Sequence, residues 1–292
     1  KMKIETVGFV GLGLIGGSLS MALGRAGYNT YGYNRSKKPL EYAVKHGIVG
    51  GVAENLQEYD VVFVALPHKP AVEFILKNKF KSGAVVADIC GVKKYIENAV
   101  YKEARGIRYI GTHPMAGKEV SGVENACADL FDNASMVITR GIYTDESALN
   151  VIKTLTKEMG FARIVECSAE VHDRKIAYTS QLAHVVSNCY VNDPEIDGCL
   201  GFTGGSFQDM TRIAGVDENV WAELYLNNAD NLLVSAKNLY ASLGAFIGAL
   251  EEGRETGDTQ PLIKNLSVGA AAYRNGKANN FEGDGIKVTK LK

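Results

Sequence analysis

The chain has 292 residues, 46% of them hydrophobic and 22% charged, which is ordinary globular composition and enough for about two domains. Lys plus Arg is 32 and Asp plus Glu is 33, so the net charge of -1 gives no electrostatic reason to expect nucleic acid or an anionic membrane as a partner. The five cysteines lack the spacing of a zinc site, so we expect reduced thiols and no metal. No apolar run reaches about 18 residues and no signal peptide pattern is present, so we expect a soluble, cytoplasmic protein.

The first strand is predicted over residues 6–10, TVGFV, and GLGLIGGS follows at once, before a helical pattern. This order of strand, glycine turn and helix is typical of dinucleotide binding. Gly11 permits the tight turn, Gly13 lets the backbone approach a pyrophosphate, and Gly16 allows close packing of helix against strand. We expect the cofactor contacts to be Gly11, Gly13, Leu14, Ile15 and Gly16. The alternative is a glycine-rich turn in an unliganded α/β domain.

The second strand, within NTYGYNRS, ends at Asn34, where an acidic residue normally accepts hydrogen bonds from the adenosine ribose. An amide can still bond a 2′-hydroxyl. Because the negative charge is missing and Arg35 and Ser36 follow, a 2′-phosphate would not be repelled. NADP is therefore an alternative to NAD, which we predict as the cofactor, and the sequence does not decide between them. We expect Asn34, Arg35 and Ser36 to contact the cofactor. Arg35 would otherwise stack on adenine or be solvated.

Further strands continue the pattern of a parallel sheet. Residues 60–67, DVVFVALP, and 83–94, GAVVADICGVKK, are typical of buried parallel strands, and two more strands are predicted over 136–141 and 161–167. Leu66 and Pro67 end one of these runs, and we count both among the cofactor contacts.

A histidine follows another predicted strand in the segment GTHPMAGKEVSG, residues 111–122. The strand contains Ile107, Tyr109 and Ile110, so His113 would lie at its carboxyl end, where open α/β sheets bind their ligands. His113 is therefore a candidate base, and the alternative is a loop or N-cap histidine.

Strand patterns stop near residue 168. We therefore predict a Rossmann-type, doubly wound α/β domain over residues 1–168 and an all-α domain over 169–292. Residues 169–191 and 217–253 are helical in pattern, with Asp217 as the N-cap of the second stretch. Because a helix near 35 residues exceeds ordinary globular lengths, we expect this half to form a homodimer interface. We expect the short polar tail after these helices, residues 275–292, to be mobile.

Between the two helical stretches lies FTGGSFQDMTRIAG, residues 202–215. Ser206 resembles the cap of a short helix, and Arg212 follows Asp209 on the same face. A planar guanidinium beside glycine-rich backbone suits carboxylate recognition, whereas a surface ion pair with Asp209 is the plainer alternative. His184, on the first helical stretch, is either a core histidine or a donor that faces the substrate.

Taken together, GLGLIGGS, DICGVK, GTHPMAG with KEVSG, SQLAH, and GGSFQDMTRIA followed by Trp221 resemble the prephenate/arogenate (cyclohexadienyl) dehydrogenase family over nearly the full length. The resemblance implies a Rossmann domain, a helical dimerisation domain, and oxidative decarboxylation of prephenate to 4-hydroxyphenylpyruvate with reduction of NAD(P), in tyrosine biosynthesis. The alternatives are an arogenate dehydrogenase that gives tyrosine directly, another two-domain dehydrogenase of the β-hydroxyacid or imine reductase type, and a dinucleotide-sensing module without turnover.

By the same resemblance, His113 is the hydrogen-bond acceptor for the 4-hydroxyl of the substrate, Arg212 binds a substrate carboxylate, and His184 lies in the pocket. Glu119 resembles the acidic member of a gating network with Asp209 and Arg212, and Trp221 supports that wall. The candidate catalytic residues are His113, Arg212 and His184. The implied substrate contacts are Gly91, His113, Lys118, Glu119, His184, Gly205, Gln208, Arg212 and Trp221.

The chain departs from the family pattern at three of its motifs. Gly91 stands where many relatives place a serine that bonds the catalytic histidine, so we expect Thr112, a backbone group or water to tune His113. Gln181 stands where histidine is frequent, and Gln208 where a basic residue is common beside the substrate. Prephenate carries a keto acid and arogenate an amino acid at that end, so the choice between them stays open.

Overall fold

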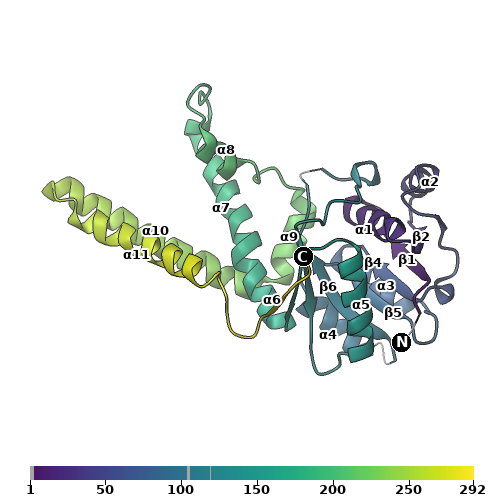
Figure 1. The fold of residues 1–292 in the computed structure, drawn as a ribbon. Helices are drawn as coiled ribbons and strands as arrows, with labels where there is room; N and C mark the ends of the chain where they lie inside the picture. The colour runs from purple at the N-terminus through teal and green to yellow at the C-terminus, as the bar shows by residue number, and fades with distance from the viewer. Residues whose placement is uncertain (1–2, 104–105, 119) are drawn as a thin grey trace. The chain divides into compact units, whose positions relative to one another are not determined.

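The computed structural model describes residues 3–103, 106–118 and 120–292, and the chain packs into two compact units (Figure 1). Unit 1 comprises Lys1–Asp173, Gly215–Asn227 and Lys287–Lys292, and unit 2 comprises Arg174–Ala214 and Asn228–Ile286. The two units alternate along the chain. The domain boundary after residue 168 stays a prediction.

Unit 1 is built on a nine-stranded sheet with the order β3-β2-β1-β4-β5-β6-β7-β8-β9. Its strands are β1 (Thr6–Val10), β2 (Asn29–Tyr33), β3 (Gly51–Val52), β4 (Val61–Val64), β5 (Val85–Asp88), β6 (Arg108–Pro114), β7 (Ser135–Thr139), β8 (Arg163–Cys167) and β9 (Lys287–Lys290). The first six strands are parallel, whereas β7 runs antiparallel to β6 and β9 antiparallel to β8. The order reverses between β1 and β4, which is the point where doubly wound sheets bind ligands. The predicted Rossmann-type class is confirmed.

Helices cover both faces of this sheet. They are α1 (Leu14–Arg25), α2 (Lys37–Lys45), α3 (His68–Lys77), α4 (Lys94–Glu103) and α5 (Glu146–Glu158), with the short turns η1 (Leu56–Glu58) and η2 (Val123–Asn125). A further helix of unit 1, α9 (Glu218–Asn227), lines a cavity of this unit. Because successive side chains of a strand point to opposite faces, Val61 and Phe63 pack in the core with α1, α2 and α5, while Val62 and Val64 pack with α3 and α4. Strands β4 and β5 are buried on both faces, as their apolar runs predicted.

Unit 2 is helical. Helix α6 (Ala169–Ile176) begins in unit 1 and enters unit 2 after Asp173. It leads through a π-helical turn, η3 (Ala177–Gln181), into α7 (Leu182–Val191), and the short elements η4 (Pro194–Ile196) and α8 (Gly205–Thr211) follow. Two long helices, α10 (Ala229–Thr256) and α11 (Gln260–Ala278), lie side by side (Figure 1). Helix α11 was not predicted. The predicted all-α class of this half holds for unit 2.

Helix α10 exposes a row of apolar side chains, which are Leu233, Val234, Leu239, Leu243, Ile247 and Leu250. Within the described residues it is also the single helix that is long and apolar enough, by length and composition alone, to cross a membrane. Exposed apolar surface of this extent marks a face that another molecule covers.

The helix predicted over residues 217–253 is divided in two. Asp217 is the N-cap as predicted, because its Oδ1 accepts hydrogen bonds from the N–H groups of Asn219 and Val220, both at 3.1 Å. Asn228 then interrupts the helix between α9 and α10 with a non-helical φ of -129°. Its buried side chain donates to Gln181 Oε1 at 2.8 Å, a contact between distant segments that no local pattern announces.

The C-terminal tail, which we expected to be mobile and free of strands, contains β9. This strand pairs with β8 from Lys290 opposite Arg163 to Lys287 opposite Glu166, so the expectation was wrong. All four residues of β9 are exposed, and so short and polar a segment carries no alternation of apolar side chains. The pairing therefore comes from the open edge that β8 offers, not from a signal in the tail.

Candidate active site

Two cavities in unit 1 lie where the sheet order reverses. One has a volume of about 540 Å³ and the other about 630 Å³, and both are lined by Leu66 and Pro67, so they are neighbouring parts of one groove. The residues predicted to bind the cofactor and found in the smaller cavity are Gly11, Asn34, Arg35 and Ser36. Those found in the larger cavity are Gly13, Leu14, Ile15 and Gly16, together with the predicted substrate contacts Gly91, Lys118 and Trp221.

The glycine turn has the geometry that a phosphate site requires. Gly11 has a φ of +93°, and a Cβ on Gly16 would lie 2.1 Å from the Gly11 carbonyl oxygen. A Cβ on Gly13 would meet nothing within 4 Å, so this position opens into the cavity. Gly13 is also the N-cap of α1 and supplies no side-chain cap, which leaves the first N–H groups of the helix for an anion.

A matched pair of substitutions distinguishes the expected role of Gly13 in phosphate binding from the role of Gly16 in helix packing. Gly13→Ala should leave the melting temperature of the protein unchanged and weaken dinucleotide binding roughly tenfold, about 1.4 kcal/mol, because the methyl group occupies the space of the pyrophosphate. Gly16→Ala should lower the melting temperature, because its methyl group meets the Gly11 backbone. Thermal unfolding and calorimetric titration of both variants test this. If both variants lose dinucleotide affinity equally and neither has a lower melting temperature, the prediction is wrong.

Asn34 is engaged within the protein. Its Oδ1 accepts the N–H of Leu12 at 3.0 Å, and its Nδ2 donates to the carbonyl of Ser36 at 3.0 Å, so the amide ties the end of β2 to the glycine turn. The end of β2 thus carries no carboxylate, and the cation of Arg35 lines the adjoining cavity.

His113 lies on β6 and contacts a second histidine. Its Nδ1 is 2.9 Å from Nε2 of His172, and Nδ1 of His172 is 2.7 Å from Oδ1 of Asp173. The Asp173 carboxylate also accepts the backbone N–H groups of Lys93 at 2.8 Å and Lys94 at 2.9 Å, where α4 begins. These contacts join the three side chains into one continuous hydrogen-bonded chain, in which His172 and Asp173 are both buried.

The opposite edge of the His113 ring faces Gly91. A Cβ on Gly91 would lie 3.9 Å from both Cε1 and Nε2 of His113, and Gly91 belongs to the wall of the larger cavity. We expected Thr112, backbone or water to tune His113, but the Thr112 hydroxyl donates to the carbonyl of Asp88 and the ring contacts His172. The side chain that contacts the His113 ring is therefore a histidine from α6.

The surroundings of His113 favour its neutral form. Burial, followed by the nearby charges of His172, Lys93 and His68, holds the pKa of His113 well below the ordinary value of a histidine. Burial also lowers the pKa of His172, against the opposing effect of Asp173. A neutral imidazole can accept a proton, as a base at this position must.

A buried ion pair holds β6, which carries His113, against the neighbouring strand β5. Lys93 donates from Nζ to Asp88 Oδ2 and to the carbonyl of Thr112, and the side chains of Lys93 and Asp88 are fully buried. Asp88 further accepts the N–H of Cys90 at 2.8 Å and the hydroxyl of Tyr109 at 2.6 Å. This network joins the ends of β5 and β6 to the start of α4.

The candidate residues of unit 2 gather around α7 and α8. His184 donates from Nδ1 to the carbonyl of Ile213 at 2.8 Å, and the hydroxyl of Ser187 donates to the carbonyl of Met210 at 2.5 Å. These bonds fasten α7 to the end of α8. The predicted substrate residues on or next to α8 are Gly205, Gln208 and Arg212, and all three are exposed.

The start of α8 differs from the prediction, and the expected roles of three residues in this region are untested. Ser206 is not the cap of α8, because the helix begins at Gly205 with Gly204 as its N-cap and without a side-chain cap. Glu119, the predicted acidic member of the gating network, lies outside the described residues. The roles of His184 and Arg212 stay predictions.

Sequence reasoning missed three residues of the site: His172, Asp173 and Lys93. A signal was present for the first two, because Ala169, His172, Asp173 and Ile176 repeat at the spacing of one helical face, and all four are buried.

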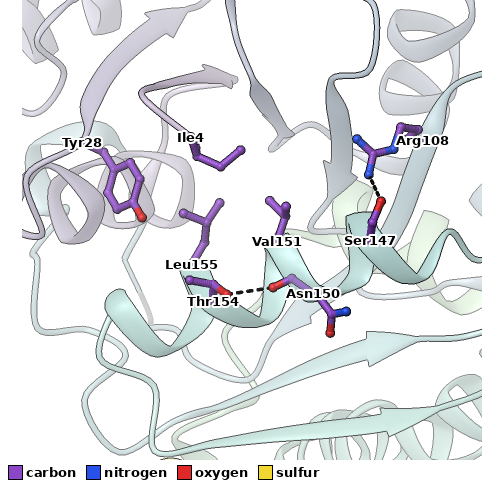
Figure 2. Close-up of a pocket in the computed structure, with 8 residues that line it drawn as sticks. All are labelled: Ile4, Tyr28, Arg108, Ser147, Asn150, Val151, Thr154 and Leu155. Atoms are coloured by element: carbon purple, nitrogen blue, oxygen red, sulfur yellow. Dashed lines mark hydrogen bonds between the residues drawn. The ribbon is translucent and has the colours of Figure 1, made fainter. Parts of the chain in front are cut away.

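A third cavity, of about 620 Å³, lies elsewhere in unit 1 (Figure 2). Ile4 precedes β1 and Arg108 opens β6, so this cavity is near the amino ends of the strands, away from the ligand edge of the sheet. Arg108 donates to Ser147, and the Thr154 hydroxyl donates to the carbonyl of Asn150 at 2.9 Å. Arg108 also bonds Asp145, and Tyr28 bonds Glu158, so these polar groups are engaged within the protein.

No group of three or more metal-ligating side chains occurs in residues 3–103, 106–118 and 120–292. All five cysteines lie within these ranges and are free thiols, as predicted.

Comparison with known proteins gives two matching family models. The prephenate dehydrogenase nucleotide-binding domain matches residues 19–166, and the prephenate dehydrogenase dimerization domain matches residues 168–266. The prephenate dehydrogenase of Bacillus subtilis is 30% identical over 244 residues, which cover 78% of this chain and 66% of that protein. The chain thus spans just under two thirds of the length of this relative.

Solved structures are also similar. The prephenate dehydrogenase from A. aeolicus in complex with hydroxyphenyl propionate and NAD+ is 26% identical, with a TM-score of 0.80 over 93% of this chain and 99% of that one. The arogenate dehydrogenase from Synechocystis is also 26% identical, with a TM-score of 0.76 over 92% of this chain and 99% of that one.

Proposed function

The chain belongs to the prephenate dehydrogenase family, and from this premise we propose that it oxidises and decarboxylates prephenate to 4-hydroxyphenylpyruvate with NAD as the hydride acceptor. The observation that carries the proposal is the position of His113, whose Nε2 edge faces the wall of the cavity that the glycine turn also lines. Arogenate is the second candidate substrate, because Gln208 offers no cation to select the keto acid and the Synechocystis neighbour is an arogenate dehydrogenase.

The residues of unit 1 fit this chemistry. The glycine turn and the uncapped start of α1 suit the pyrophosphate of a dinucleotide, which supplies the hydride acceptor when it is bound. As hydride leaves C4 of the substrate, the 4-hydroxyl becomes a carbonyl and His113 Nε2 takes up its proton. The ring carboxylate then departs as CO2, and the electron pair of the broken bond makes the ring aromatic as a phenolate. The proton held on His113 Nε2 returns to the phenolate oxygen and gives the 4-hydroxyl of the product.

NAD is supported by the A. aeolicus neighbour, which was solved with NAD+. NADP stays the alternative, because Asn34 brings no negative charge to the end of β2 and Arg35 lines the same cavity.

We further propose that Arg212 binds a substrate carboxylate through its planar guanidinium, with His184 as a neighbouring pocket residue. Arg212→Ala should raise KM for the substrate about tenfold or more and change kcat much less, since orientation of the carboxylate is lost while His113 is intact. Arg212→Lys should recover part of the affinity. Steady-state kinetics measure both, and an unchanged KM in the alanine variant refutes the role.

We propose that the chain is a soluble, cytoplasmic homodimer that binds neither nucleic acid nor a membrane. A second copy would cover the apolar face of α10, and the matching of residues 168–266 to a dimerization domain supports this. Sedimentation at micromolar concentration should give a dimer, and a stable monomer would count against it.

The proposed function is tested by following the absorbance of the reduced nicotinamide with prephenate and with arogenate, each in the presence of NAD and of NADP. We expect the highest kcat/KM with prephenate and NAD. Turnover with arogenate alone would move the assignment to the second candidate. A protein that binds NAD and turns over none of the four combinations would contradict the proposal.

A further inference from the structure

We propose that His172 and Asp173 are positioning residues that keep the proton of the neutral His113 ring on Nδ1 and so present Nε2 as the proton acceptor. The inference rests on the proposed function in one respect, namely that a substrate hydroxyl is the proton donor. The arrangement of protons itself follows from the hydrogen bonds of these three side chains.

Asp173 ends this hydrogen-bonded chain as an acceptor. Its Oδ1 accepts the backbone N–H of Lys93 at 2.8 Å and its Oδ2 accepts that of Lys94 at 2.9 Å, at the start of α4. A carboxylate whose two oxygens both accept has no proton to donate. The Nδ1 of His172, at 2.7 Å from Oδ1, must therefore carry a proton and donate it.

The proton on His172 Nδ1 then determines the partner ring. In a neutral imidazole one nitrogen donates and the other accepts, so Nε2 of His172 is an acceptor. His113 Nδ1, at 2.9 Å from that nitrogen, must be the donor. The lone pair of His113 is consequently on Nε2, the edge beside Gly91 in the cavity wall.

This orientation cannot come from the position where a serine is frequent in the family. Gly91 has no hydroxyl, and the hydroxyl of Thr112 is bonded to the Asp88 carbonyl. Without His172, His113 would distribute its proton between both nitrogens, and the form with the proton on Nε2 has no lone pair for the substrate. His172 therefore fixes the position of the His113 proton, as a hydroxyl bonded directly to His113 would otherwise do.

The same pair offsets the charge that the reaction places on His113. When Nε2 accepts the substrate proton, the ring becomes a buried cation close to Lys93 and His68. Asp88 neutralises Lys93, so the negative charge left for the new imidazolium is Asp173, which acts through the His172 ring. The Nδ1 proton of His113 can shift toward His172 Nε2, which shares one positive charge between two rings.

The tautomer can be measured directly, because the chain has only five histidines. Nitrogen-15 NMR of the full-length protein labelled at histidine distinguishes a protonated Nδ1 from a protonated Nε2, without substrate. His113→Gln and His172→Gln identify the two signals by their disappearance. In the wild type we expect His113 to carry its proton on Nδ1 at neutral pH.

Two substitutions of His172 distinguish the effect of losing the hydrogen-bond acceptor from the effect of altered packing. His172→Gln can keep an oxygen near the place of Nε2 and should preserve the Nδ1 proton of His113 and most of kcat. His172→Phe removes the acceptor, so the His113 signal should become a mixture of tautomers and kcat should fall roughly 10- to 100-fold, with KM little changed. His46→Phe, at an exposed histidine, is the matched control and should change neither quantity.

Asp173→Asn provides a second route if His172→Phe fails to fold. It removes the charge that orients His172, and it should shift the His113 tautomer and lower kcat in the same direction. The proposal is overturned if His113 keeps its proton on Nδ1 in both variants, or if His172→Gln and His172→Phe lose kcat equally with the tautomer unchanged. If the tautomer responds as expected while the wild type turns over neither prephenate nor arogenate, the positioning pair stands and the proposed function fails.

Discussion

Replacement of His113 by alanine is expected to lower kcat about 10²- to 10⁴-fold, the loss typical of a missing general base. NAD affinity should stay nearly unchanged, because the glycine turn and the start of α1 do not depend on this ring. Stopped-flow and steady-state kinetics with the reduced nicotinamide as signal, together with calorimetric titration of NAD, measure the two quantities. An alanine variant with wild-type turnover would remove His113 from the mechanism.

The wild type should show the matching pH dependence. The base must be neutral to accept a proton, and burial places the pKa of His113 below the ordinary value near 6.5. Activity should therefore persist as the pH falls through about 6.5 and be lost only in more acidic solution. A loss of kcat centred at the pKa of a solvated histidine would indicate a different base.

The second large effect concerns stability. Lys93→Met should reduce the free energy of unfolding by about 3–5 kcal/mol, because it leaves the carboxylate of Asp88 buried without its cation. Urea denaturation followed by circular dichroism measures the change. The exposed pair between Lys77 and Glu73 is the control, and Lys77→Met should cost about 0.5 kcal/mol or less.

A double variant distinguishes the destabilisation caused by the unpaired buried charge from that caused by lost packing of the Lys93 side chain. In Lys93→Met with Asp88→Asn, the amide oxygen can still accept from Cys90 N–H or Tyr109, and no unpaired charge remains. Much of the lost stability should return. If the double variant is as unstable as the single one, the ion pair is not the source of the effect.

The sequence was sufficient to predict the first eight strands apart from the two-residue β3, and most clearly β1, β4 and β5, which are short apolar runs buried on both faces and followed by a turn or helix signal. The break at Asn228 and the strand β9 were missed for one reason. Both depend on a partner distant in sequence, Gln181 in the first case and the β8 edge in the second. Local periodicity carries no information about such pairs.

The same distinction applies to the site. The glycine turn and His113 were predictable because their strand, turn and helix context is local. His172 comes from 59 residues further along the chain and meets His113 only after β6 and α6 pack together. Lys93 is fully buried, although a lysine after a strand is ordinarily solvated, and its partners Asp88 and Thr112 become apparent only in the folded sheet.

In the proposed reaction one site couples hydride transfer to loss of the ring carboxylate, with His113 as the proton acceptor. Reduced nicotinamide and CO2 can be measured together during turnover of prephenate by the wild type and by His113→Ala. We expect equal amounts of the two products in the wild type and a parallel decrease of both in the variant. Reduced nicotinamide formed without CO2, or an undiminished rate in the variant, would contradict it.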